Sequence, residues 1–125
     1  MIEDEKDRLL DLFADEQRWC QHAEAMNQEQ DPVRYDDESA AAWDLVGGLC
    51  YLFGWPRARQ LFGELEGHIV GRPGTASDLD ADIAAMTALV EFNDARDTTY
   101  DKVMATLREL EVRPGRSSSD DRNSM

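Results

Sequence analysis

Apolar residues recur at helical spacing along most of this chain. The clearest stripe lies between residues 56 and 70, where apolar side chains fall at i, i+3, i+4, i+7 and i+11. Similar stripes predict helices over residues 4–17, 79–92 and 98–110. No segment shows a convincing apolar-polar alternation of the kind that predicts a strand. Together with the segment described next, the pattern predicts an all-α fold of about five helices.

The remaining predicted helix, residues 37–53, is apolar nearly all round, which is typical of a central helix covered by its neighbours. Asp36 or Asp37 can cap its start, because a carboxylate accepts the free N–H groups of a first helical turn. Gly47 and Gly48 lie inside it and lower its helical stability. We therefore expect a close approach of another backbone there, or a local kink.

Glycine and proline mark where the helices end. Gly54 and Pro56 leave only a short link between the second and third helices, which predicts an antiparallel hairpin. The run Gly-Arg-Pro-Gly at 71–74 predicts a break before the fourth helix. After Val112 the chain is rich in Ser, Arg and Asp. We expect a compact single helical domain over residues 1–112 and a disordered tail over 113–125.

The charge is strongly negative and unevenly placed. The 125 residues include 27 Asp and Glu against 13 Lys and Arg, a net charge of -14. Residues 1–44 hold 14 acids and 4 bases, whereas residues 45–71 hold 2 of each. Such a surplus argues against a free-standing nucleic-acid binder, because phosphate contacts need Lys and Arg. No apolar run is long enough for a bilayer and residues 1–7 lack a signal-peptide core, so we expect a cytoplasmic protein without membrane contact.

We expect neither a metal nor a cofactor. Asp78, Asp80 and Asp82 alternate as at the start of a calcium loop, but Ile83 and Leu89 replace the glycine and glutamate that the loop requires. These acids are better interpreted as residues that favour a helix N-terminus through its dipole.

The two cysteines and two histidines do not form a metal-binding pattern. Cys20 and His22 are only two residues apart, and neither His22 nor His68 has a partner at helical spacing that would build a metal site. Buried, reduced thiols are the simplest interpretation. A thiol nucleophile activated by a histidine remains an alternative without a specific motif to support it.

The chain also contains three tryptophans, Trp19, Trp43 and Trp55. Each is interpreted as a residue of the core or its edge. A tryptophan that proved to be exposed would be a candidate anchor for a partner protein, because aromatic side chains dominate many interfaces.

Three short motifs give the chain a family resemblance. They are Trp19-Cys20-Gln21-x-Ala23, Ala42-Trp43-x-Leu45-x-Gly47-Gly48-Leu49 and Phe92-Asn93-Asp94. Over about residues 5–111 the chain resembles a family of small proteins, catalogued as a domain of unknown function, from actinobacteria and their phages. His22 stands where that family usually has Gly, and Gly48 where it usually has Ala. The resemblance implies a compact helical domain and assigns no catalytic residue.

For function, the charge leads to a first hypothesis: a non-catalytic binding or regulatory protein that docks on a basic protein surface. Acidic charge steers association with basic sites. Such a protein could occupy the groove of a nucleic-acid-binding protein, as a phage-type inhibitor or a DNA mimic would. The expected contact residues are Glu29, Asp31, Asp36, Asp37 and Glu38, with Asp4, Glu5, Asp15 and Glu16 in a secondary role.

Two other hypotheses remain open. In one, the chain is an accessory or structural domain whose charge serves only solubility. In the other, it is a small enzyme or ligand-binding module around Cys20, His22 or Asn93-Asp94, which requires those residues to share a pocket. The sequence does not define an oligomeric state, nor whether the acids of 29–38 and of 78–82 meet on one face.

Overall fold

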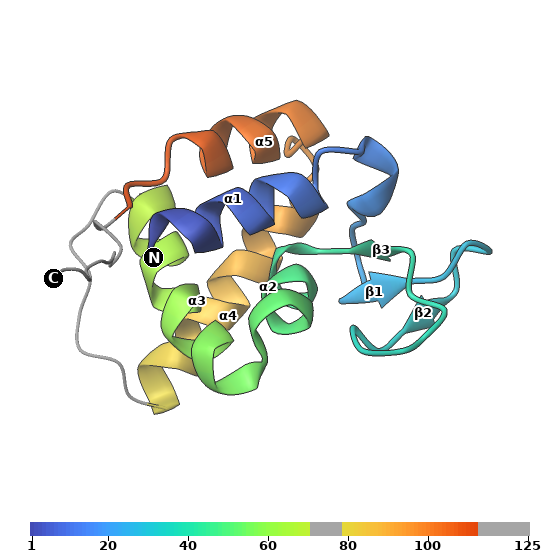
Figure 1. Cartoon of the computed structure of the whole chain (residues 1–125), viewed down its shortest axis with the longest axis horizontal. Helices are drawn as coiled ribbons and strands as arrows, with labels where there is room; N and C mark the ends of the chain where they lie inside the picture. The colour runs from blue at the N-terminus through green and yellow to red at the C-terminus, as the bar shows by residue number, and fades with distance from the viewer. Residues whose placement is uncertain (71–78, 113–125) are drawn as a thin grey trace, which may run out of the picture.

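A body of helices and a small lobe that projects from it make up the described chain (Figure 1). The computed structural model describes residues 1–70 and 79–112. Its all-α body confirms the predicted fold class. The predicted break at 71–74 and the predicted tail at 113–125 lie outside the described residues. The body consists of α1 (Glu3–Leu12), α2 (Leu45–Phe53), α3 (Trp55–Val70), α4 (Leu79–Asp94) and α5 (Tyr100–Arg108).

Helix α2 lies at the centre of the body, as its sequence predicted. It contacts α1, α3 and α4, and every residue from Leu45 to Cys50 is buried. Leu49 meets a core to which the other helices contribute residues with no exposed surface, such as Phe13 and Phe62. The α2–α3 pair forms the expected hairpin through Gly54, whose φ of 78° is easily adopted only by glycine.

The lobe lies between α1 and α2 and holds a small sheet that the sequence pattern did not predict. A short 3₁₀ turn, η1 (Glu16–Arg18), leads into it. The strands are β1 (Ala25–Met26), β2 (Pro32–Val33) and β3 (Ala42–Trp43), in the antiparallel order β2-β1-β3. Strands of two residues are too short to show an alternation of apolar and polar positions.

The predicted helix 37–53 is therefore too long at its start. Its first part is extended, because the Ala41 N–H donates to the carbonyl of Met26 and β3 pairs with β1. Helix α2 begins only after Asp44, whose side chain accepts from the Gly47 N–H at 2.6 Å. Asp36 and Asp37 are consequently turn residues of the lobe and not the helix cap.

Smaller boundary differences have similar local causes. Helix α1 ends at Leu12 rather than near residue 17, since Asp15 starts η1 by accepting from the Gln17 N–H. Helix α5 is capped by Thr99, one residue later than predicted, which accepts from the Lys102 N–H.

The close backbone approach expected at the paired glycines is present at Gly47. A Cβ atom on Gly47 would lie 1.9 Å from the carbonyl oxygen of Glu24, so only glycine fits between α2 and the lobe. A Cβ on Gly48 would lie 2.7 Å from the Phe13 ring. These two positions let α2 pack directly against the lobe and α1.

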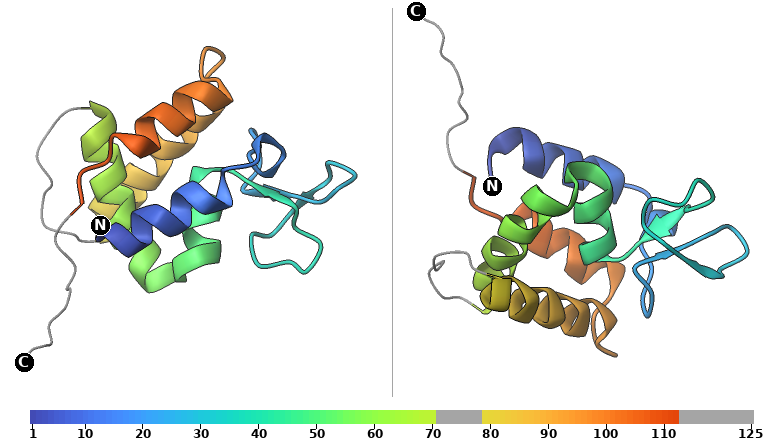
Figure 2. Two further views of the ribbon diagram at one scale, coloured as in Figure 1. Left: turned by 45° about the horizontal axis from the view of Figure 1, so that its top comes forward. Right: turned by 90° about the horizontal axis from the view of Figure 1, so that it is seen from below.

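Helices α1 and α5 lie side by side although they are far apart in sequence (Figures 1 and 2). The Lys6 ammonium donates to the carbonyls of Arg108 at 2.6 Å and Leu110 at 2.9 Å, at the end of α5. At the other end of the pair, the Tyr100 hydroxyl donates to the Phe13 carbonyl at 2.6 Å. Among the described helices, none combines the length and the apolar character needed to cross a bilayer.

Candidate functional site

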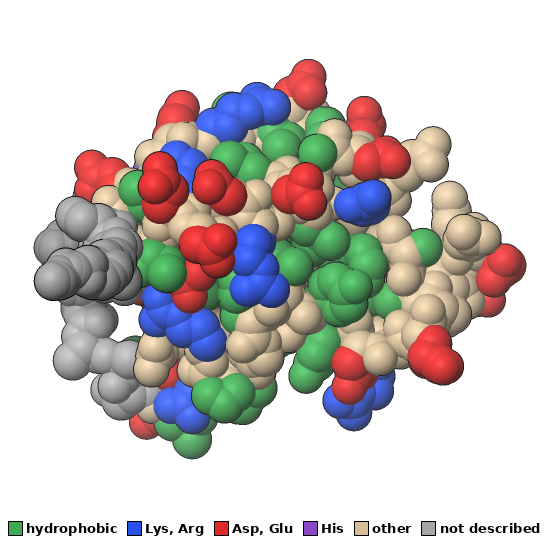
Figure 3. All heavy atoms as spheres, in the orientation of Figure 1, with side chains coloured by type: hydrophobic (Ala, Val, Ile, Leu, Met, Phe, Trp, Pro, Cys, Tyr) green, Lys and Arg blue, Asp and Glu red, His purple; other side chains and the backbone are tan. Residues whose placement is uncertain are grey.

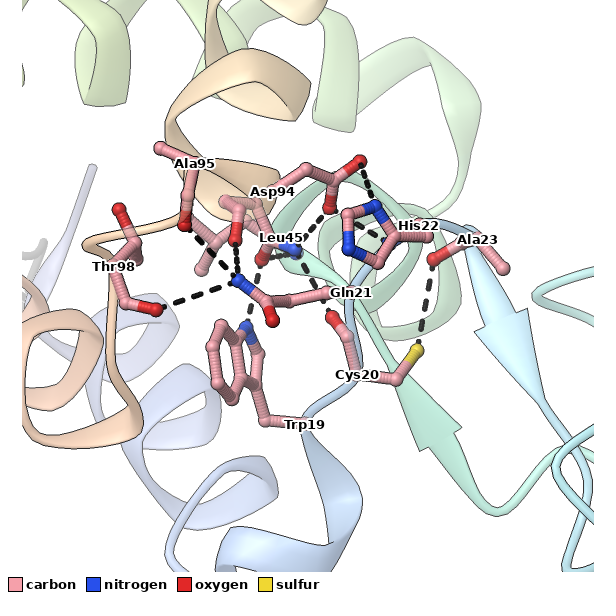
Figure 4. A network of polar contacts seen from close by, with 10 residues as sticks. Trp19, Cys20, Gln21, His22, Ala23, Leu45, Asp94, Ala95 and Thr98 are labelled. Carbon is pink, nitrogen blue, oxygen red and sulfur yellow. Dashed lines mark hydrogen bonds and ion pairs between the residues drawn. The ribbon is translucent and has the colours of Figure 1, made fainter.

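The junction between the lobe and the body is built around Asn93, near the end of α4 (Figure 4). Its side chain is fully buried. The amide oxygen accepts from the Trp19 indole at 2.8 Å and from the Leu45 N–H at 3.1 Å. The amide nitrogen donates to the Cys20 carbonyl at 3.0 Å and to the Asp94 carboxylate at 2.9 Å. One side chain thus joins α4, the start of α2 and the first residues of the lobe.

Gln21 adds a second connection to the same helix end. Its amide nitrogen lies 2.9 Å from the Asn93 carbonyl and 3.4 Å from the carbonyls of Ala95 and Thr98. Carbonyls in the last turn of a helix lack intrahelical partners, so the bond from Gln21 supplies the Asn93 carbonyl with a donor. Gln21 therefore caps α4 from the lobe.

His22 is the last junction residue of this segment, and its backbone conformation is unusual. Its φ is 71°, in the left-handed region, and its N–H donates to the Asp94 carboxylate at 2.9 Å. Glycine adopts such a φ without steric cost, whereas a residue with a Cβ, such as His22, adopts it less readily. The His22 ring is exposed, with Nδ1 4.0 Å from the second Asp94 oxygen.

The three motifs behind the family resemblance therefore meet in one place. Trp19 to Ala23, Ala42 to Leu49 and Phe92 to Asp94 contribute the residues of this junction. The Asn93 amide uses both of its hydrogens and accepts two bonds, so it keeps no free donor for a substrate. The arrangement positions the lobe on the body.

Both cysteines are free and buried, as predicted. The Cys20 thiol lies 3.6 Å from the Ala23 carbonyl oxygen, to which it donates. Burial, reinforced by the negative charges of Asp44 and Asp94, raises the pKa of the Cys20 thiol to about 12. Burial likewise raises the pKa of Cys50 to about 12. These environments oppose formation of the thiolate that a nucleophilic cysteine requires.

Asp44 is a buried carboxyl group at the same junction, with 3% of its surface exposed. Burial raises its pKa to about 7, against the opposing effect of the hydrogen bond from the Gly47 N–H, and the charges of Asp94 and Glu24 raise it further. The burial of Asp44 could not be predicted from the sequence, because an Asp before a helix is usually a solvent-exposed cap.

No group of three or more His, Cys, Asp or Glu side chains that could hold a metal gathers within residues 1–70 and 79–112. Of the alternating acids at the start of α4, Asp82 is buried in an ion pair with Arg59 at 3.0 Å. Asp80 is exposed, and Asp78 lies outside the described residues.

All five primary acids of the predicted contact surface are exposed on the lobe: Glu29, Asp31, Asp36, Asp37 and Glu38. Figure 3 shows acidic side chains along the outer edge of the lobe. Asp36 pairs with Arg34 at 3.0 Å. Asp37 accepts from the side chain and N–H of Ser39, which lowers the Asp37 pKa. The start of α4 lies at the far end of the body, so the two acidic stretches do not meet (Figures 1 and 2).

Of the secondary acids, Glu5 was wrongly expected to be exposed. It retains only 8% of its exposed surface because its carboxylate makes two hydrogen bonds to Arg57, at 2.6 and 2.7 Å. This pairing holds the Glu5 pKa below its usual value. Asp4, Asp15 and Glu16 are exposed as expected.

The lobe also carries two grooves. The larger, of about 650 Å³, lies between η1 and the lobe, and the smaller, of about 290 Å³, lies beside the turns of the lobe. Asn27, Gln28 and Ala41 line both, so the two grooves adjoin each other. The sequence pattern indicated neither groove, because it did not predict the pairing of β1 with β3 that brings residues 27–30 and 38–42 together.

The tryptophans occupy different environments. Trp43 is buried and Trp19 is partly buried, as interpreted from the sequence, whereas 42% of the surface of Trp55 is exposed. Trp55 rests edge-on against Phe62, with ring centroids 5.9 Å apart. It is thus the exposed tryptophan of the described chain and the candidate anchor among the three.

The fold and the junction define a small helical domain whose polar lobe is fixed to the end of α4. The chain belongs to the family of unknown function DUF6197, whose model matches residues 7–113. This confirms the suspected membership of an uncharacterised helical family. A search of curated proteins and a search of solved structures each gave no match.

Proposed function

We propose that the protein is a non-catalytic binding protein that docks its lobe on a basic protein surface. The observation that carries this proposal is the charge of the lobe. Residues 19–43 contain 6 acids and a single base, Arg34. Arg34 is itself paired with Asp36, so the acids of the lobe dominate its outward charge.

The position of the lobe supports this role. It projects from the body, where a partner can reach it from several sides (Figure 2). On the body, by contrast, acidic side chains over α1 and α5 alternate with Lys and Arg side chains (Figure 3). A concentrated negative charge raises the rate of association with a basic partner and opposes association with acidic ones.

The groove of a nucleic-acid-binding protein is one basic surface that the lobe could occupy, as a DNA mimic or an inhibitor would. The alternative of an accessory domain with purely solubilising charge predicts no specific partner. The alternative of an enzyme around Cys20 and His22 receives less support, since burial opposes ionisation of the Cys20 thiol.

The test compares two triple neutralisations. Partners are captured from a lysate at low salt, identified by mass spectrometry, purified, and titrated calorimetrically at about 0.05 M and about 0.5 M salt. The lobe variant carries Glu29→Gln, Asp31→Asn and Glu38→Gln, all exposed acids. The matched control carries Asp7→Asn, Asp11→Asn and Glu109→Gln on the helical body.

We expect the lobe variant to bind the purified partner about tenfold or more weakly, with a smaller salt dependence, and the control to bind as wild type. Equal affinities for wild type and lobe variant would contradict the proposal. Equal losses in both triple variants would indicate that net charge, and not the lobe, determines binding.

A further inference from the structure

The two adjoining grooves on the lobe, together called the groove, have a floor made by small residues. Ala41 and Ala42 line the groove beside the edge of β3, where larger side chains would fill the space. The Ala41 N–H donates to the Met26 carbonyl at 2.8 Å, which fixes this part of the floor to β1. The groove is thus a feature of the paired strands and not of a loose loop.

Unused hydrogen-bonding groups line the sides of the groove. The side-chain amides of Gln28 and Gln30 make no hydrogen bond within the described part of the chain, and each offers a donor and an acceptor. Asn27 fixes the turn that presents them, because its side-chain oxygen accepts from the N–H groups of Glu29 and Asp31 at 3.0 Å. Paired donors and acceptors of this kind match the peptide groups of an extended chain.

Carboxylates stand towards both ends of the groove. Asp15 lies at the η1 side, and Glu29 and Glu38 lie at the other side. Arg18 is the single base among the lining residues. Trp19 and Met26 add apolar surface between them, which suits the aliphatic stems of Lys and Arg side chains.

We propose that this groove binds an extended polypeptide segment that carries Lys or Arg side chains. The inference rests on the proposed docking function and gives it a site and a partner chemistry. Amide groups of the groove bond the peptide backbone, and the carboxylates at its ends receive the basic side chains. A neutral oligosaccharide can donate hydrogen bonds to the carboxylates but carries no positive charge to complement them, and a nucleic acid would be repelled by them.

The test uses a fluorescent peptide of alternating Arg and Gly as its probe, with a Gln-Gly peptide and a neutral oligosaccharide for comparison. Binding is measured by fluorescence anisotropy at low salt and mapped by NMR. Ala41→Leu fills the groove without changing charge. Ala105→Leu, at an exposed position of α5, is the matched control. Thermal unfolding verifies that both variants fold. If Ala41→Leu does not fold, a double variant with Gln28→Ala and Gln30→Ala takes its place.

We expect the Arg-Gly peptide to bind, to shift the Trp19 indole and Gln28 amide signals, and to bind Ala41→Leu at least about tenfold more weakly than Ala105→Leu. If Ala41→Leu bound the Arg-Gly peptide as tightly as wild type while the lobe triple variant no longer bound it, the groove proposal would be overturned. The docking function would remain supported. Unchanged affinity of the Arg-Gly peptide for both variants would also overturn the groove proposal. Equal binding of the Gln-Gly peptide or the oligosaccharide, or no binding of the Arg-Gly peptide, would overturn the groove proposal alone, because captured partners test the docking function independently.

Discussion

The side chain of Asn93 makes four hydrogen bonds from a position that solvent does not reach. The partners are Cys20 and Trp19, which are 73 and 74 positions away, Leu45, which is 48 positions away, and the neighbouring Asp94. From the sequence, Asn93 and Asp94 could be singled out by a short motif, but not connected to Trp19 or Leu45. Contacts of this kind depend on how the elements pack, which local periodicity does not encode.

Removal of the Asn93 amide should destabilise the whole domain. Asn93→Ala leaves the Leu45 N–H, the Cys20 carbonyl and the Trp19 indole without partners in a buried site. We expect the free energy of unfolding to fall by about 3 kcal/mol, measured by urea denaturation. Thr87→Ala, an exposed change in the same helix, should change it by less than about 0.5 kcal/mol. A similar small effect for Asn93→Ala would contradict this account of the junction.

Asp44 should make stability depend on pH near neutrality. Its pKa rises from 3.8 to about 7 on folding, so between these values the folded state holds a proton that the unfolded state has released. The contribution of Asp44 to stability is therefore fully present below about pH 4 and is lost as the pH rises through about 7. The shift corresponds to roughly 4 kcal/mol.

The measurement is the free energy of unfolding between pH 5 and pH 8 for wild type and Asp44→Asn, which retains an oxygen acceptor for the Gly47 N–H. The wild type should lose stability relative to the variant as the pH rises. Asp31→Asn, at an exposed site, should behave as wild type. Parallel pH profiles for wild type and Asp44→Asn would show that the Asp44 carboxyl is not the titrating group.

At the scale of elements, the helical stripes located α3, α4 and α5 closely, because each buries one face against the core. The segment 37–44 was misassigned for a physical reason. Three alanines favour a helix, but β3 instead satisfies its backbone by pairing with β1, and tertiary pairing outweighs a weak intrinsic preference. The boundary between the sheet and the helix lies at Asp44, which caps the first turn of α2.

Glycine substitutions test this element boundary. Gly47→Ala would place a methyl group 1.9 Å from the Glu24 carbonyl oxygen and should force the lobe away from α2, at a cost of several kcal/mol. Gly63→Ala in α3 is the matched control, since among the described residues no atom outside the neighbouring backbone of α3 lies within 4 Å of its Cβ position. That change should stabilise the protein by up to about 1 kcal/mol. Thermal unfolding distinguishes the two, and a tolerated Gly47→Ala would contradict the close approach.

At the scale of the whole molecule, composition led to the proposal of a basic partner but did not indicate where such a partner would dock. The acid surplus and its concentration in residues 1–44 were visible from the sequence. The structure divides that stretch between a helix, where Glu5 is buried against Arg57, and a lobe, where the acids face solvent. The groove depends on the register in which β1 pairs with β3. Strands of two residues are too short for that register to be predicted from the sequence.

The hydrogen bonds of Lys6 also constrain how the protein is made. The carbonyls that Lys6 binds belong to residues 102 and 104 positions further along the chain. A ribosome extends a chain at roughly 5–20 residues per second, so α1 spends several seconds without its neighbour α5. During that time α1 can pack against α2 but not against α5, so the contacts between α1 and α5 form only towards the end of synthesis.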